Sequence, residues 1–169
     1  RIVYDLLQLS RLSSEQLVMK RESCDVTQII DASIASLSYK ANKKGLQIQT
    51  NYENKEPIFV DPGQMQIVIN NLISNAISYS DHGAITVSTL YRGDSYVIEV
   101  KDEGRGISKE DQERIFERFY RTDKARSRVS GGSGLGLSIV KSVLDAHNAQ
   151  LVIESEVDKG SSFQIWIKN

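Results

Sequence analysis

The chain has 169 residues, 40% of them hydrophobic and 25% charged, which is typical of one soluble globular domain with at most a small appendage. A formal net charge of −1 argues against a nucleic-acid-binding surface, although it leaves room for a local basic patch. One cysteine, Cys24, excludes an internal disulfide and a cysteine metal cluster, and the printed residues contain no apolar run long enough to span a membrane.

Residues 1–20 carry apolar side chains at helical spacing, among them Ile2, Leu6 and Leu9, which predicts a helix. The apolar stripe is wide, and no partner helix lies beside it in the sequence. We therefore expect it to pack on a helix outside the printed residues or on a second copy of the chain, with packing on its own domain as the alternative. Because Arg1 already falls within this helical pattern, we expect the chain to be a piece of a longer protein.

The first half of the chain then predicts two capped helices. Asp25 with Gln28 is a helix-start signal ahead of an apolar repeat that reaches about residue 43. Asp61 followed by Pro62 is a second start signal, for a helix that ends near Tyr79. Alternating apolar and polar residues predict a strand at 46–52 between these helices, and a short second strand is expected at 58–60.

Strands are more frequent in the second half of the chain. The turn at 92–94 joins two alternating segments into a hairpin, and a capping box at 108–111 predicts a helix that reaches about Phe119. Residues 121–130 are rich in cationic side chains and poor in apolar ones, which predicts a mobile loop. A last helix is expected at 138–147, and strands are expected at 84–91, 95–102, 149–156 and 162–168.

Helices and antiparallel strands that occur in blocks, without an internal repeat, predict the α+β class. We expect a two-layer α/β sandwich in which a mixed, mostly antiparallel sheet is covered on one face by helices. His147 lies at the end of the last helix, where a cationic side chain is commonly favourable. Neither His147 nor His82 has a cysteine or second histidine beside it that would suggest a metal site.

A glycine-rich stretch at 130–137 leads directly into the last helix. Glycine lets other groups approach the backbone closely, and a helix start offers free N–H donors and a positive dipole end. The stretch therefore predicts a phosphate-binding site, and a flexible surface loop is an equally supported alternative. Its spacing matches neither a P-loop nor a dinucleotide-binding fingerprint.

Two amides, Asn71 and Asn75, lie four residues apart and so share one face of an otherwise apolar helix, with Ser78 and Tyr79 one turn further on. Carboxamide oxygens are hard ligands that suit Mg²⁺ beside phosphate oxygens and water. The alternative is that the two amides form hydrogen bonds with a neighbouring loop.

Asp102 shares a strand face with the apolar Tyr96 and Val100, so its carboxylate is predicted to point inward. Such a carboxylate can accept a hydrogen bond from an exocyclic amine, and the glycines that follow, Gly104 and Gly106, would let a flat ring approach the backbone. An aspartate that caps its own turn is the alternative. Further along, Arg118 and Arg121 lie three residues apart and suit phosphate oxygens, or are solvated surface charges.

Four segments occur in an order that resembles the catalytic and ATP-binding domain of bacterial sensor histidine kinases, within the wider family of gyrase B, Hsp90 and MutL. They are similar to the N, G1, F and G2 boxes of that family: 71–76, 102–107, 115–121 and 132–137. Residues 4–11 also resemble the end of the second helix of the dimerisation and histidine-phosphotransfer domain. The resemblance implies the Bergerat ATP-binding fold, with the end of the dimerisation helix and a linker at 1–20 and the catalytic domain at 21–169.

The resemblance also implies roles for individual residues. Asp102 would hold the adenine amine, Asn71 and Asn75 would hold Mg²⁺ and the phosphates, and Asn71, Arg118 and Arg121 would be the catalytic residues. Residues 122–133 would be the mobile ATP lid. ATP binding is implied for Asn71, Asn75, Tyr79, Asp102, Gly104, Gly106, Ile107, Arg118, Arg121, Gly132, Gly134, Leu135, Gly136 and Leu137.

The implied function is transfer of the γ-phosphoryl group of Mg-ATP to a histidine on the dimerisation domain, in two-component signal transduction. The implied partners are that domain of the same protein, a downstream response regulator, and a second copy in the full-length homodimer. The resemblance also implies that the chain is the cytoplasmic part of a membrane-bound sensor. The sequence departs from the family at Ser78, where many relatives have lysine, and neither histidine has the phosphoacceptor setting. An ATP-driven clamp or chaperone ATPase and a nucleotide-binding interaction module of a degenerate kinase remain as alternatives. The ATPases place glutamate where Asn71 stands.

Overall fold

The computed structural model describes residues 2–13, 18–122 and 134–168. The helices are α1 (Ile2–Ser13), α2 (Val26–Lys43), α3 (Pro62–Tyr79), α4 (Lys109–Gln112) and α6 (Gly136–Ala146). The strands are β1 (Glu22–Cys24), β2 (Gln47–Tyr52), β3 (Ile58–Val60), β4 (Ala84–Arg92), β5 (Ser95–Asp102), β6 (Gln150–Glu156) and β7 (Gly160–Lys168). Among these residues, no helix is both long and apolar enough to cross a bilayer.

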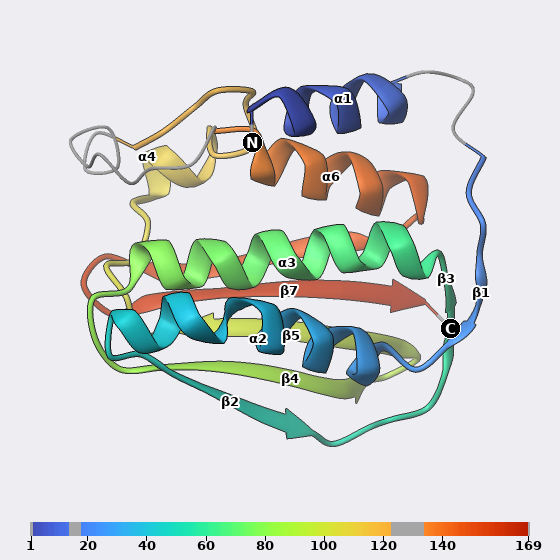
Figure 1. Cartoon of the computed structure of the whole chain (residues 1–169), viewed down its shortest axis with the longest axis horizontal. Helices are drawn as coiled ribbons and strands as arrows, with labels where there is room; N and C mark the ends of the chain where they lie inside the picture. The colour runs from blue at the N-terminus through green and yellow to red at the C-terminus, as the bar shows by residue number, and fades with distance from the viewer. Residues whose placement is uncertain (1, 14–17, 123–133, 169) are drawn as a thin grey trace.

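The main sheet has five strands in the order β2-β4-β5-β7-β6. Only the β2–β4 pair in it is parallel, and β1 and β3 form a separate antiparallel ribbon. Helices α2, α3 and α6 lie next to one another over one face of the sheet (Figure 1). The predicted fold class, a mixed and mostly antiparallel sheet with helices on one face, is therefore confirmed.

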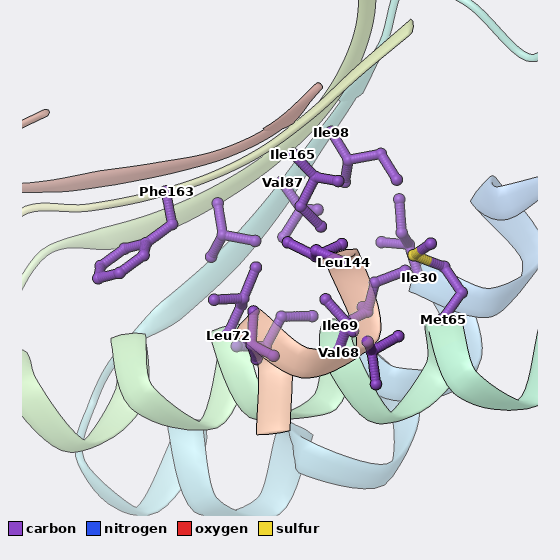
Figure 2. Packing of buried hydrophobic residues seen from close by; sticks show 14 of the residues in the cluster. Ile30, Met65, Val68, Ile69, Leu72, Val87, Ile98, Leu144, Phe163 and Ile165 are labelled. Atoms are coloured by element: carbon purple, nitrogen blue, oxygen red, sulfur yellow. The ribbon is translucent and has the colours of Figure 1, made fainter. Parts of the chain in front are cut away.

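The core lies between this helical layer and the sheet. Figure 2 shows Leu72 of α3 and Leu144 of α6 among the side chains that meet Val87, Ile98 and Ile165 of the sheet. All five side chains are at most 2% exposed. Burial of apolar surface on this scale stabilises the fold by about 25 cal/mol per Å² removed from water, so the sheet and the helices form one packed unit.

The predicted helix starts are confirmed by their caps. The Asp25 carboxylate accepts a hydrogen bond from the Thr27 N–H at 3.0 Å, and the Asp61 carboxylate accepts one from the Gln64 N–H at 3.1 Å. Each side chain thereby satisfies an N–H donor that the first turn of a helix leaves without a partner.

Two predicted helix ends were wrong. The helix expected to reach Phe119 stops at Gln112, because the following residues form successive turns and Phe119 adopts a φ of 64°. The helix expected over 1–20 stops at Ser13 in the described residues, and 18–20 are not helical. The Lys20 N–H donates a hydrogen bond to the Asp61 carboxylate at 2.9 Å. Strand β1, which the sequence did not predict, begins two residues later.

Helix α1 packs on α6 of its own domain, which had been the alternative (Figure 1). Leu9 is 3% exposed in this contact. The opposite face of α1 is uncovered, since Val3 is 71% exposed and Leu7 is 53% exposed. A partner for this second face therefore stays a prediction.

His147 connects the end of α6 to the start of α3. Its Nε2 accepts a hydrogen bond from the Asp61 N–H at 3.0 Å, and its Nδ1 lies 2.9 Å from the carbonyl oxygen of Val143. This pattern requires a neutral ring with its proton on Nδ1. Burial lowers the pKa of His147, as does the charge of Arg21, against the opposing hydrogen bond to Val143. At this helix end His147 is therefore a neutral hydrogen-bonding side chain and not a cation.

We expect the free energy of unfolding to fall as the pH drops below about 6.5, the ordinary pKa of histidine. The unfolded chain then binds a proton that the buried ring of His147 resists, which costs up to about 1.4 kcal/mol per pH unit. Urea unfolding between pH 7.5 and 5 measures this slope. The slope should decrease in His147→Gln and persist in His82→Gln, and equal slopes in His147→Gln and the parent chain would contradict the assignment.

Candidate functional site

A cavity of about 270 Å³ opens between the second half of α3, the end of β5 and the segment that follows it. It brings together six of the predicted site residues: Asn75, Tyr79, Asp102, Gly106, Ile107 and Leu137. It also includes Thr122, the first residue of the predicted lid, and residues to which the sequence assigned no role in the site, among them Arg105, Asp111, Ser161 and Phe163. Residues that are up to 88 positions apart in the chain therefore form one concave site.

Asp102 lies at the end of β5 with its carboxylate turned into the cavity wall. It shares its strand face with Tyr96 and Val100, as the alternation predicted, and it is 5% exposed. Its Oδ1 accepts a hydrogen bond from the Gly104 N–H at 2.9 Å, so the side chain does cap its own turn. The inward orientation and the turn cap, which the sequence left as alternatives, are both present.

Burial raises the pKa of the Asp102 carboxyl, and hydrogen bonds from the backbone N–H groups of Gly104 and Ser161 partly oppose this rise. No cation is among the causes of the shift. The carboxylate is thus a buried acceptor whose negative charge is poorly compensated. Such a group favours a ligand that donates a hydrogen bond.

The backbone beside Asp102 packs too closely to allow side chains. A Cβ on Gly104 would overlap the carbonyl oxygen of Tyr79, and one on Gly106 would overlap the carbonyl oxygen of Glu156. Gly106 also has a φ of 68°, in the left-handed region that glycine favours. The two glycines therefore allow the G1 segment to lie directly between α3 and β6.

The two amides of α3 have different surroundings. Asn75 lines the cavity, whereas Asn71 does not. The Asn71 Nδ2 donates a hydrogen bond to the carbonyl oxygen of Ile67 in its own helix at 2.9 Å, and a Cβ on Gly136 would lie 2.9 Å from the Asn71 Oδ1. Asn71 therefore contacts the start of α6, and Asn75 is the one of the two that lines the cavity.

Of the two predicted arginines, Arg121 lies close enough to the cavity for its charge to act on Tyr79. Burial raises the pKa of Tyr79, and the positive charges of Arg121 and Arg105 oppose this rise. Arg121 is half-buried and precedes Thr122 of the cavity wall, whereas Arg118 is exposed and is not part of that wall.

The glycine-rich stretch is described from Gly134 onward. The Phe119 N–H donates a hydrogen bond to the carbonyl oxygen of Gly134 at 3.0 Å, which connects the F box to the start of α6. Leu135 is fully buried, and Leu137 lines the cavity. Gly132 and residues 123–133 of the lid predicted over 122–133 lie outside the described residues.

Arg105 and Asp111 are the main charged residues that the sequence analysis missed. Arg105 stands between the two glycines of the G1 segment, a position that could have drawn attention to it. Asp111 was read only as part of a helix-start signal, but it also accepts a hydrogen bond from the Tyr120 hydroxyl. Within the described part of the chain, no group of three or more His, Cys, Asp or Glu side chains could hold a metal ion.

Residues 60–169 match the family of histidine kinase-, DNA gyrase B-, and HSP90-like ATPases. The chain belongs to this ATPase family. The matched region begins just before α3 and includes every residue of the cavity wall named above. The match does not cover α1, α2 or β2.

Relatives of the chain within the ATPase family include named sensor kinases. The sensor-like histidine kinase SenX3 of Mycolicibacterium smegmatis is 39% identical over 167 residues, which are 98% of this chain and 44% of SenX3. The sensor protein SrrB of Staphylococcus aureus is 33% identical over 166 residues, which are 98% of this chain and 28% of SrrB. The chain thus spans less than half the length of these relatives.

Solved structures of histidine kinases share the fold. The histidine kinase AdeS of Acinetobacter baumannii superposes with a TM-score of 0.82 at 25% identity, over 98% of this chain and 76% of that one. The catalytic domain of the histidine kinase ThkA gives 0.77 at 23% identity, over 89% and 96% of the two chains. Full-length ShkA in complex with AMPPNP gives 0.87 at 24% identity, over 98% and 35%. The resemblance to histidine kinase catalytic domains is therefore confirmed.

Proposed function

We propose that the chain binds Mg-ATP in the cavity beside Asp102 and transfers its γ-phosphoryl group to a histidine of a dimerisation domain, in two-component signalling. The observation that carries the proposal is the buried carboxylate of Asp102, whose Oδ1 already accepts a hydrogen bond from Gly104. The exocyclic amine of adenine is a donor of the kind that this carboxylate favours. Ile107 and Phe163 supply apolar walls for the rest of the base.

The phosphate chain would extend from the base toward Asn75 and the start of α6. Asn75 offers a carboxamide oxygen, a hard ligand that fits Mg²⁺ beside phosphate oxygens, and Mg²⁺ would neutralise the charge of the phosphates. Asn71 remains a candidate ligand if its amide turns away from Gly136. Tyr79, with Arg121 or Arg118, would contact the phosphates, together with the backbone of Gly134, Leu135 and Gly136.

For the transfer itself, the chain's contribution would be position and charge. In-line phosphoryl transfer needs little covalent chemistry from the protein, so aligned phosphates and neutralised oxygens account for most of the rate. An amide at Asn71 cannot accept a proton from water. The ATPases of the family have glutamate there, so hydrolysis by this chain should be slow.

The organisation of the whole protein is part of the proposal. Residues 1–20 would be the end of the dimerisation helix and a linker, and 21–169 the catalytic domain. The uncovered apolar face of α1 supports a helical partner from the dimerisation domain, in a homodimer. The names of the relatives support a sensor kinase, for which we propose a response regulator downstream. We also propose that the sensor is membrane-bound, with this domain in the cytoplasm.

Incubation of the chain with Mg²⁺ and γ-labelled ATP, with and without the dimerisation domain of the full-length protein, tests the function. We expect label on the histidine of the added domain, no stable label on this chain, and slow ATP hydrolysis. His147 is 6% exposed and engaged in two contacts, which is one reason to expect no self-labelling. Rapid hydrolysis without transfer would favour the clamp ATPases, and calorimetry that detects no Mg-ATP binding would refute the proposal altogether.

A further inference from the structure

The C-terminal end of α3 forms one side of the cavity, and two cations bind its last carbonyl groups. The Lys44 Nζ donates hydrogen bonds to the carbonyl oxygens of Ile77 at 2.7 Å and Ser78 at 3.3 Å. The Arg105 guanidinium donates to the carbonyl oxygens of Ser78 at 3.0 Å and Tyr79 at 3.4 Å. Helix ends leave such carbonyls without partners, so both cations stabilise the same helix end.

Arg105 makes contacts that Lys44 does not make. Its guanidinium carbon lies 5.5 Å from the centre of the Tyr79 ring, within range of a cation–π interaction. The backbone N–H of Arg105 also donates a hydrogen bond to the carbonyl oxygen of Tyr79, at 3.1 Å. The Arg105 side chain is 18% exposed, and both Arg105 and Tyr79 line the cavity, whereas Lys44 does not.

We propose that Arg105 is a positioning residue for the nucleotide, which acts by fixing the ring of Tyr79 as a wall of the cavity. This inference rests on the proposed binding of Mg-ATP. A guanidinium that bonds the helix end and lies over the ring holds the side chain of Tyr79 in one orientation before a ligand arrives. The ligand then does not bear the entropic cost of ordering that side chain. The planar guanidinium of arginine is suited to forming these hydrogen bonds while it lies over the ring, and the ammonium of lysine is not.

Lys44 provides the matched control, because it bonds the same helix end outside the cavity. We expect Arg105→Gln to weaken the binding of Mg-ATP, measured by calorimetry, by about fivefold. Both substitutions should lower the melting temperature by a few degrees, but Lys44→Gln should change the affinity by less than about twofold. Arg105→Lys, which retains the charge but not the planar guanidinium, should recover only part of the affinity. Equal affinities of Arg105→Gln and the parent chain would overturn the proposal.

A double-mutant cycle tests whether Arg105 acts through Tyr79. Tyr79→Leu keeps an apolar side chain but removes the ring, so Arg105→Gln should cause no further loss of affinity in that background. A full fivefold loss there would show that Arg105 contacts the nucleotide itself, and the positioning role would be wrong. A parent chain that binds no Mg-ATP would instead refute the proposed function, so the two failures are distinguishable.

Discussion

Replacing Asp102 with asparagine should weaken Mg-ATP binding by roughly 30- to 150-fold, which corresponds to about 2–3 kcal/mol. The Oδ1 of the new amide can still accept the hydrogen bond from Gly104, so the turn is retained. Its NH₂ group, however, would face the amine of adenine, donor against donor, at a position that is only 5% exposed. Calorimetric titration with Mg-ATP measures the loss.

The same substitution should leave the free energy of unfolding at pH 7 unchanged or raise it. Burial raises the pKa of the Asp102 carboxyl above its ordinary value of about 3.9. The ionised group therefore costs stability in the parent chain once the pH exceeds that value, and a neutral amide removes the cost. Asp94→Asn, at the exposed end of the β4–β5 hairpin, is the matched control and should alter neither quantity. Unchanged ATP affinity in Asp102→Asn would remove the adenine role of this residue.

Replacing Gly106 with alanine should destabilise the fold by about 3–5 kcal/mol and abolish nucleotide binding. The new Cβ would overlap the carbonyl oxygen of Glu156 at a φ of 68°. It cannot move away easily, because the neighbouring Ile107 N–H donates to the Ser155 hydroxyl at 2.8 Å and the Arg105 carbonyl accepts from the Asp158 N–H at 2.7 Å. Urea unfolding measures the loss.

A matched substitution at Gly93 separates the two causes of the loss at Gly106, which are steric overlap and backbone strain. It has a φ of 61°, close to that of Gly106, but a Cβ there would meet nothing within 4 Å. Gly93→Ala should therefore show only the backbone strain, about 1–2 kcal/mol. If the two alanine variants lost the same free energy, close packing against β6 would not be the reason for glycine at 106.

The features that could be predicted from the sequence depend on local patterns. The inward orientation of Asp102 follows from strand alternation alone, and the starts of α2 and α3 follow from aspartates that bond their own first turns. The stop of α4 at Gln112 and the existence of β1 could not be predicted in this way. Glu22–Cys24 has no run of apolar residues that would indicate a strand, and β1 owes its formation to β3, more than thirty residues away.

In the candidate site, too, local patterns could be predicted from the sequence and contacts between distant segments could not. Asn71 and Asn75 were correctly placed on one helix face, but only the packed α6 shows that Asn71 contacts Gly136 while Asn75 faces the cavity. The position of Arg105 over Tyr79 depends on two segments that meet only in the folded chain. Non-local contacts of this kind leave no periodic signal in the sequence.

Helix α6 mechanically connects two distant parts of the molecule. At one end, the Arg21 guanidinium donates a hydrogen bond to the carbonyl oxygen of Ala146 at 2.7 Å, and His147 is bonded to Asp61, which also holds Lys20. At the other end, Gly136 lies against Asn71, beside the cavity. Eleven helical residues form a rod about 16 Å long that resists bending. A pull on the segment that follows α1 would therefore displace this rod as a whole and move its far end at the edge of the cavity.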